Sequence, residues 1–411
     1  MVKAFTHLLP PSARFARRRG VASKPCILFA VVALLSLAAT LIAQTKPRPD
    51  AVEAAVARAV EIVLERQEGS GEAQWPYEGV YRVKGEIPIG YRIGGTAIAG
   101  MALLRAPGYD QDERRRAALR RAASFVAGGI EHARMAHQFE ARYDVRGWGY
   151  TYGLTFLLAL RASERIPEGL AHDTEAAIRF YVDGLEATAI PQSGGWNYSR
   201  GAGFHEPGPA APFMTAPTLQ ALFEAARQGY EVDGEIVRLG LKSLERARAP
   251  TGAFAYSGAA TEGRRNAVPG AIGRMPAAEV TMYLAGRSDL SRIRGAIDAF
   301  LVHWQWLEDR RAKPGTHAGR YGIAPYYFYF AHLYAAQAVE LLPAHERAEY
   351  RRRTRELLLA TRSETGSWND RVFPRSVSYG TSTAILSLMM AEAPPPARWE
   401  DGEPRSDDVK K

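Results

Sequence analysis

Three consecutive stretches near the C-terminus decide the fold: residues 344–362 are AHERAEYRRRTRELLLATR, residues 365–370 are TGSWND, and residues 379–391 are YGTSTAILSLMMA. The first stretch carries many charges and places apolar residues at helical spacing, which predicts a half-exposed helix. The glycine of the second permits a turn. The third is small or apolar on nearly every face, and a helix of that kind is buried on all sides.

The same unit occurs six times along the chain. Charged amphipathic helices are predicted at 50–66, 110–130, 169–188, 232–247, 289–308 and 344–362. Apolar partners are predicted at 92–105, 151–163, 213–228, 275–285, 324–341 and 379–391. Alternating half-exposed and fully buried helices are what two concentric rings require, and the inner ring needs small residues for close approach. We therefore predict an all-α protein with a single (α/α)6 toroid over residues 48–392.

A glycine or an aromatic residue, usually both, marks each turn between a charged helix and its apolar partner. The turns are Gln74-Trp75, Gly147-Trp148, 194–198 (GGWNY), 251–254 (TGAF), Gly319-Arg320-Tyr321 and 365–370. We expect the aromatic ring to pack against the end of the charged helix and to seal the repeat.

These turns resemble the glycine–tryptophan repeats of the squalene–hopene cyclase and prenyltransferase superfamily, most clearly from Tyr326 to Met390. The resemblance implies a toroid with a central cavity. Its cyclases use an Asp-x-Asp-Asp motif, and the nearest match, Asp110-Gln111-Asp112-Glu113, is placed to cap a helix. Its prenyltransferases bind zinc partly through cysteine, but Cys26 is the only cysteine and lies in the leader. The sequence thus predicts a member without the acid motif, and no metal or other cofactor.

Residues 1–43 are predicted to be a signal peptide or membrane anchor, because basic residues up to Lys24 precede an uncharged apolar run, 26–43. We expect an exported protein, periplasmic or membrane-anchored, that meets the membrane through this segment if it is not cleaved. The leader holds six of the 53 Lys and Arg residues and no acid, so the other 47 nearly balance the 44 acids. No nucleic-acid partner is therefore expected. The charged, proline-rich residues 394–411 are predicted to be an unstructured tail.

Polar residues on the inner helices and their turns are the candidate site. Glu279 and Asp370 are the candidate catalytic acids. Glu279 lies within an apolar helix and must be paired, protonated or facing a wet cavity, with a structural ion pair as the alternative. Arg320 could also form a structural pair with Asp370, and the tyrosines and the histidine could be core residues with satisfied hydrogen bonds. The candidate ligand-binding residues are Tyr152, Arg320, Tyr326, Tyr327, His332 and Tyr379.

Three functions remain open on the sequence. The first is a binding or scaffold protein of the cell envelope whose cavity takes a hydrophobic or glycan-like ligand, without family catalysis. The second is a terpenoid cyclase-like enzyme. The third is a polysaccharide lyase or hydrolase on the same double ring, a lyase using a Tyr or His base and an Arg that neutralises the uronate. The glycine–aromatic turns favour the cyclase lineage over the glycan lineage, whereas the missing acid motif argues against cyclisation.

Overall fold

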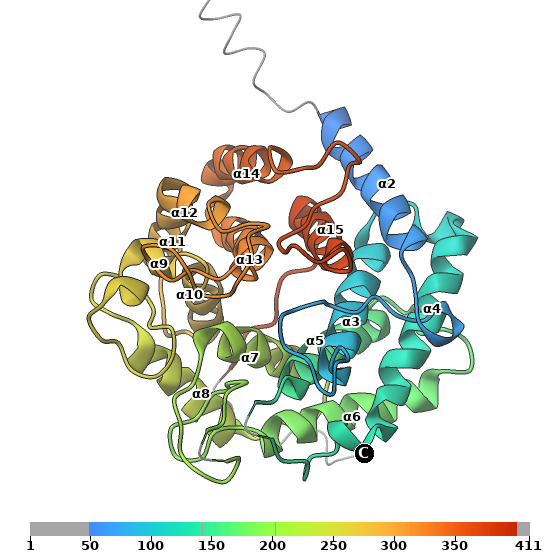
Figure 1. Cartoon of the computed structure of the whole chain (residues 1–411), viewed down its shortest axis with the longest axis horizontal. Coiled ribbons are helices and arrows are strands. Elements are labelled where there is room, and N and C mark those ends of the chain that lie inside the picture. The colour runs from blue at the N-terminus through green and yellow to red at the C-terminus, as the bar shows by residue number, and fades with distance from the viewer. Residues whose placement is uncertain (1–48, 142, 202, 401–411) are drawn as a thin grey trace, which may run out of the picture. The chain divides into compact units, whose positions relative to one another are not determined.

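The computed structural model describes residues 49–400 except 142 and 202, and over these residues the protein is all-α and has no strand. Six helices form an outer ring and six an inner ring (Figure 1). The outer helices are α2 (Pro49–Glu65), α4 (Glu113–Gly128), α6 (Ala171–Ala187), α8 (Gly234–Ala247), α11 (Leu290–His303) and α14 (Ala344–Leu359). The inner helices are α3 (Ile89–Arg105), α5 (Arg146–Ala162), α7 (Pro212–Arg227), α10 (Met275–Leu284), α13 (Tyr327–Leu341) and α15 (Ser376–Leu388). The predicted (α/α)6 toroid is confirmed.

Burial differs between the two rings as the sequence pattern predicts. Every residue of inner helix α15 is buried, whereas only Thr354 and Leu358 of outer helix α14 are. The two short helices α9 (Val268–Ala271) and α12 (Gln305–Glu308) belong to the connections between rings. The last inner helix, α15, packs on both α2 and α3, so the first and sixth pairs meet and close the ring.

Small residues allow the inner helices to approach closely. A side chain at Gly149 of α5 would place its Cβ 3.0 Å from the backbone of Gly90 on α3. A Cβ at Gly94 would lie 2.4 Å from the ring of Trp148. The expectation that the crowded inner ring needs small residues is confirmed at this contact between α3 and α5.

The glycine–aromatic turns form the same hydrogen bonds in three repeats. The indole N–H groups of Trp75, Trp196 and Trp368 donate to carbonyls of Val63, Leu185 and Leu358 in the preceding outer helices, at 2.6–3.0 Å. The backbone N–H groups of the same tryptophans donate to the hydroxyls of Thr96, Thr215 and Thr381 on the following inner helices, at 3.0–3.1 Å. Each tryptophan therefore ties an outer helix to its inner partner, which confirms the predicted seal.

Glycine is required where such a turn passes between helices. Gly195 has a φ of 75°. A Cβ at this position would lie 2.5 Å from the Ser243 hydroxyl and 2.8 Å from the Thr215 hydroxyl. Both the backbone conformation and the available space exclude a larger residue.

Two predicted features differ in the structure. Gly147-Trp148 is not a turn but the start of α5, and Trp148 contributes its ring to the centre of the toroid. The predicted unstructured tail begins with residues that pack on the ring: Ala397 is buried, and the Trp399 N–H donates to the Leu284 carbonyl at 3.0 Å. The correction applies to residues 394–400, because the rest of the tail lies outside the described residues.

The predicted signal or anchor segment, 1–43, also lies outside the described residues. Within the part of the chain that is described, no helix combines the length and the apolar character needed to cross a membrane.

Candidate functional site

A pocket of about 810 Å³ lies at the end of the ring where the inner helices begin. Its walls come mainly from the long connections that lead from an outer helix to the next inner helix. Seven tyrosines line it: Tyr77, Tyr81, Tyr91, Tyr143, Tyr198, Tyr256 and Tyr326. The aromatic wall is polar as well as apolar, because each ring carries a hydroxyl.

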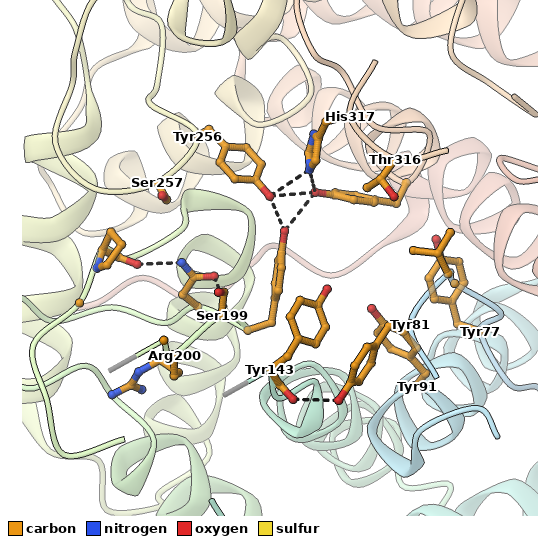
Figure 2. Close-up of a pocket in the computed structure, with 18 of the residues that line it drawn as sticks. Tyr77, Tyr81, Tyr91, Tyr143, Ser199, Arg200, Tyr256, Ser257, Thr316 and His317 are labelled. Atoms are coloured by element: carbon orange, nitrogen blue, oxygen red, sulfur yellow. Dashed lines mark hydrogen bonds between the residues drawn. The ribbon is translucent and has the colours of Figure 1, made fainter. Parts of the chain in front are cut away.

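Two of these hydroxyls, those of Tyr256 and Tyr326, contact His317, and the hydroxyl of Tyr198 contacts both of them. We name these four residues the tyrosine–histidine cluster; Tyr256 and His317 are labelled in Figure 2. The Tyr256 hydroxyl lies 2.5 Å from that of Tyr198 and 3.1 Å from His317 Nε2. The Tyr326 hydroxyl lies 3.2 Å from that of Tyr198 and 3.3 Å from the same histidine nitrogen. Tyr256 is therefore the hydroxyl that links the imidazole most directly to the other tyrosines.

The backbone fixes which nitrogen of His317 carries the proton. Nδ1 lies 2.9 Å from the Gly322 carbonyl, which only accepts hydrogen bonds, so Nδ1–H is the donor. In the neutral ring Nε2 is then a free acceptor that faces the hydroxyls of Tyr256 and Tyr326. Burial lowers the pKa of His317, so the ring is neutral near pH 7 and its Nε2 is available to accept a hydrogen bond from a tyrosine hydroxyl.

Arg371 also lines the pocket and brings a positive charge to it. Its side chain is buried, and its Nη1 has no hydrogen-bond partner among the described residues. Arg200, a second arginine of the lining, donates instead to the carbonyls of Thr188 and Phe204. Arg371 is thus the arginine of the described lining with an unpaired donor, and that Nη1 atom is buried within the wall.

Asp370 lies directly beneath the pocket wall. It is fully buried and accepts a hydrogen bond from the Tyr77 hydroxyl on Oδ2 at 3.4 Å, while its Oδ1 has no partner among the described residues. Burial raises the pKa of Asp370 to about 7, although Arg371 opposes the shift. The carboxyl therefore holds its proton close to neutral pH.

Aromatic rings fill the centre of the toroid below the pocket. The Tyr77 ring lies 4.7 Å from that of Tyr379 and 5.5 Å from that of Trp148. The Trp148 ring lies 5.0 Å from that of Tyr152, which lines a second pocket at the other end of the ring. The central cavity is therefore divided in two by side chains.

Carboxylates are missing from the lining of the tyrosine-rich pocket. None of the described residues that line it is Asp or Glu, and Asp370 reaches it only through Tyr77. Glycoside hydrolases generally use two carboxyl groups that flank the scissile bond. The lining offers instead tyrosines, a histidine, arginines and Asn197.

The predicted ligand-binding residues do not form one site. Tyr326 lines the tyrosine-rich pocket and Tyr152 the opposite one. Tyr327 and Tyr379 are buried among other rings. Arg320 is exposed beside the Tyr321 ring and is not paired with Asp370 in the described structure, because the arginine next to that acid is Arg371.

Two further candidates have structural partners, as their alternative interpretations predicted. Glu279 is buried in an ion pair with Arg248 at 3.1 Å and accepts a hydrogen bond from the Ser288 hydroxyl. His332 accepts a hydrogen bond from the Trp304 indole at 2.9 Å, and burial lowers its pKa to about 3. Neither residue lines a pocket described here.

The acid cluster 110–113 serves the helix, as the sequence indicated. The Asp112 carboxylate accepts a hydrogen bond from the Arg115 N–H at the start of α4, and Asp110 pairs with Arg165 on the surface. The motif-like spacing reflects helix capping.

No protein-family model matches this sequence, and no curated protein matches it either. Solved structures do resemble it. The unsaturated glucuronyl hydrolase of Bacillus sp. GL1 superposes with a TM-score of 0.55 at 12% identity, over 84% of this chain and 98% of that one. The unsaturated glucuronyl hydrolase of Streptococcus agalactiae superposes with a TM-score of 0.53 at 13% identity, over 82% of this chain and 92% of that one. An inactive variant of the alpha-1,6-mannanase of Salegentibacter sp. HEL1_6, in complex with alpha-1,6-mannotriose, gives 0.53 at 12% identity, over 83% and 99%.

The chain shares the (α/α)6 toroid of these hydrolases. At such low identity the likeness concerns the fold alone. The resemblance to squalene–hopene cyclases is therefore supported at the level of the ring, and the preference of the turn pattern for a cyclase lineage over a glycan lineage is not.

The tyrosine–histidine cluster escaped the sequence analysis except for Tyr326. Its members come from four separate positions in three connections, and only folding brings them together. One signal was present: Tyr77, Tyr198, Tyr256 and Asp370 each stand two residues after the sealing aromatic of a turn. The second position after the sealing aromatic thus carries a polar group in these four turns.

Proposed function

We propose that the protein is an exported carbohydrate-active enzyme that cleaves an acidic polysaccharide by β-elimination. The observation that carries the proposal is the tyrosine–histidine cluster in a pocket that also holds the unpartnered donor of Arg371 and lacks a carboxylate pair. Tyrosine rings suit the apolar faces of sugars, and a buried guanidinium suits a uronate carboxylate. The basic-then-apolar leader supports export.

The chemistry requires a base, a proton donor and a counter-charge. Arg371 binds the uronate carboxylate and stabilises the negative charge that builds up when C5 loses its proton. The Tyr256 hydroxyl gives its proton to His317 Nε2, and the phenolate takes the C5 proton. The C4–O bond then breaks, a C4=C5 double bond forms, and the leaving oxygen takes the proton from Tyr256. His317 finally returns its proton to Tyr256, so no proton is gained or lost.

Hydrolysis is the second candidate, and one observation favours it. Asp370, with a pKa raised to about 7 by burial, is protonated at the pH where a general acid must donate. The similar solved structures are hydrolases, which agrees with this alternative. Against it, Asp370 lies behind Tyr77, and the described part of the lining supplies no second carboxylate.

A product assay separates the candidates. The purified protein is incubated with polyuronates, sulfated uronate polysaccharides and neutral mannans, and both unsaturated sugar ends and new reducing ends are measured. The proposal expects unsaturated ends from a uronate polymer. Tyr256→Phe should lower the rate at least about 100-fold, since proton transfer by a positioned group contributes that much. Tyr350→Phe, on an outer helix, is the matched control and should keep full activity.

Other outcomes contradict elimination. Hydrolysis would be established if the protein produced new reducing ends without unsaturated ends, and if this activity were lost in Asp370→Asn but kept in Tyr256→Phe. Saturable binding of a glycan with no product of either kind would leave the binding role that the sequence first suggested.

A further inference from the structure

A second cavity lies at the end of the ring where the inner helices finish. It measures about 900 Å³ and is separated from the tyrosine-rich pocket by the aromatic rings at the centre of the toroid. Helix ends and the C-terminal segment build it, and none of the residues assigned to catalysis above reaches it. It therefore needs an explanation of its own.

The walls of this cavity are largely apolar. Side chains of α3, α13 and α15 contribute, and three consecutive prolines of the C-terminal segment close one side. The apolar members include Met101, Leu104, Leu333, Leu386 and Pro394–Pro396. A surface of this composition suits a hydrocarbon body.

Arg105 differs from the other described arginines of this cavity. Arg347 and Arg398 also have no ion pair in the described structure, but they contact the Leu342 carbonyl and the Tyr283 ring. Arg105, the last residue of α3, follows Leu104 in the wall. Within the described residues no hydrogen bond, ion pair or ring contact is recorded for its guanidinium, whereas Arg227 of the same cavity pairs with Glu224 at 2.6 Å. Burial lowers the pKa of Arg105 and no acid opposes the shift. Arg105 is partly buried, and a bound anion would supply the counter-charge that its guanidinium lacks.

A second polar residue of the described lining, Gln337, has an unpaired atom. The buried Oε1 of Gln337 has no partner in the described structure, although its Nε2 donates to Gln220 Oε1 at 2.9 Å. Gln337, Arg105 and Tyr152 all line the cavity. The wall thus combines an apolar surface with polar and charged side chains, among them Glu224, Glu340 and Glu392, and an amphiphile needs both kinds of contact.

The C-terminal segment holds the cavity closed on one side. Residues 393–400 cross behind the inner helices, visible as the red segment behind α7 in Figure 1. Trp399 anchors the segment by its hydrogen bond to Leu284 and by packing 5.6 Å from the Phe223 ring, and the Arg398 guanidinium lies 5.2 Å from the Tyr283 ring. We name this segment the strap. It is placed to retain a ligand.

We propose that this cavity is a binding site for an amphiphilic carboxylate, whose acyl chain lies against the apolar wall and strap and whose head group pairs with Arg105. The site is independent of the chemistry proposed for the tyrosine-rich pocket.

Calorimetry with sodium decanoate, at concentrations below those that form micelles, tests the proposal on the full chain. Wild-type protein should bind one molecule saturably. Arg105→Met should weaken binding at least about tenfold, since a charge-assisted contact is lost. Arg227→Met is the matched control, because its charge already has a partner, and should change the affinity less than about twofold. Hydrogen exchange of residues 390–400 should slow when decanoate binds.

A charge comparison keeps the test decisive if Arg105→Met does not fold. Wild-type protein should then bind decanoate at least about tenfold more tightly than 1-decanol. Absence of saturable decanoate binding, equal affinity for the two compounds, or equal loss in Arg227→Met would overturn the proposal. Tyr256→Phe should bind decanoate normally, so failure of the elimination chemistry and failure of this site are distinguishable.

Discussion

The two ends of the ring are made by the same helix pairs but differ in chemistry. At one end the connections are long, 66–88, 129–145, 188–211, 248–274, 304–326 and 360–375. They carry six tyrosines, a histidine and an arginine with an unpaired Nη1 into a pocket, to which α3 adds Tyr91. At the other end the connections are short, 106–112, 163–170, 228–233, 285–289 and 342–343, and helix faces leave a largely apolar cavity under a strap. Long loops on a rigid scaffold are free to acquire polar groups.

The tryptophan seals should make the loop-rich end the more important one for stability. Trp368→Ala removes a buried ring and the indole hydrogen bond to the Leu358 carbonyl, and should lower the free energy of unfolding by about 3–5 kcal/mol. Trp399→Ala in the half-exposed strap should cost about 1 kcal/mol. Urea unfolding followed by circular dichroism measures both. If both substitutions lowered the free energy of unfolding equally, the tryptophan seals would not make the loop-rich end more important for stability.

Asp370, at the loop-rich end, should make the stability of the folded protein depend on pH. Its pKa is about 7 in the folded chain and near 4 when unfolded, so between these values the folded state keeps a proton that the unfolded state releases. Stability must then fall as the pH rises from about 4 to 7, by an amount of the order of 4 kcal/mol. Asp370→Asn should lack this fall. His332 gives the stability of both proteins an opposite dependence on pH, and subtracting the unfolding free energies of wild type and Asp370→Asn at each pH removes it. If the two stability curves ran parallel, Asp370 would not be the group that causes the fall.

Arg371 and Arg105 should recognise different anions. In the Tyr256→Phe background, Arg371→Met should weaken binding of an acidic oligosaccharide about 10- to 100-fold, because a charge-assisted hydrogen bond is lost. Arg105→Met at the opposite end should leave that affinity unchanged. Titration calorimetry measures both affinities. If Arg105→Met weakened oligosaccharide binding, or Arg371→Met weakened decanoate binding, the two cavities would not be independent sites.

The smallest effect is expected at Arg320, a predicted ligand-binding residue that the structure places on the surface. Arg320→Ala should change the unfolding free energy by less than about 0.5 kcal/mol and leave oligosaccharide affinity intact. The same urea and calorimetric measurements apply. A marked loss of affinity would show that the pocket extends to this turn.

The sequence predicted the ring well because its signals are local. Helical periodicity, the small residues of 379–391 and the glycine–tryptophan turns each reflect contacts within one repeat. The start of α5 was predicted too late, at residue 151 rather than Arg146, because Gly147-Trp148 indicated a turn but lies within the helix, where Gly149 allows close packing against α3.

The site was predicted poorly because it depends on contacts between repeats. Tyr198, Tyr256 and His317 belong to different connections, and nothing in their local sequence shows that the three side chains meet. The unpaired state of Arg105 is likewise a property of the assembled cavity. Glu279 stood out in an apolar helix, but the identity of its partner, Arg248, is set by the packing of α10 beside α8.

Ring closure has a consequence for synthesis. Tyr77 and Asp370 meet across the junction of the first and sixth pairs, as do Ser376 and the Glu78 carbonyl. While the protein emerges from the ribosome, the earliest helices have no neighbour on one flank until the final pair is made. A nascent chain therefore exposes the apolar side of α2 and α3 longest, and the tyrosine-rich pocket exists only after translation is almost finished.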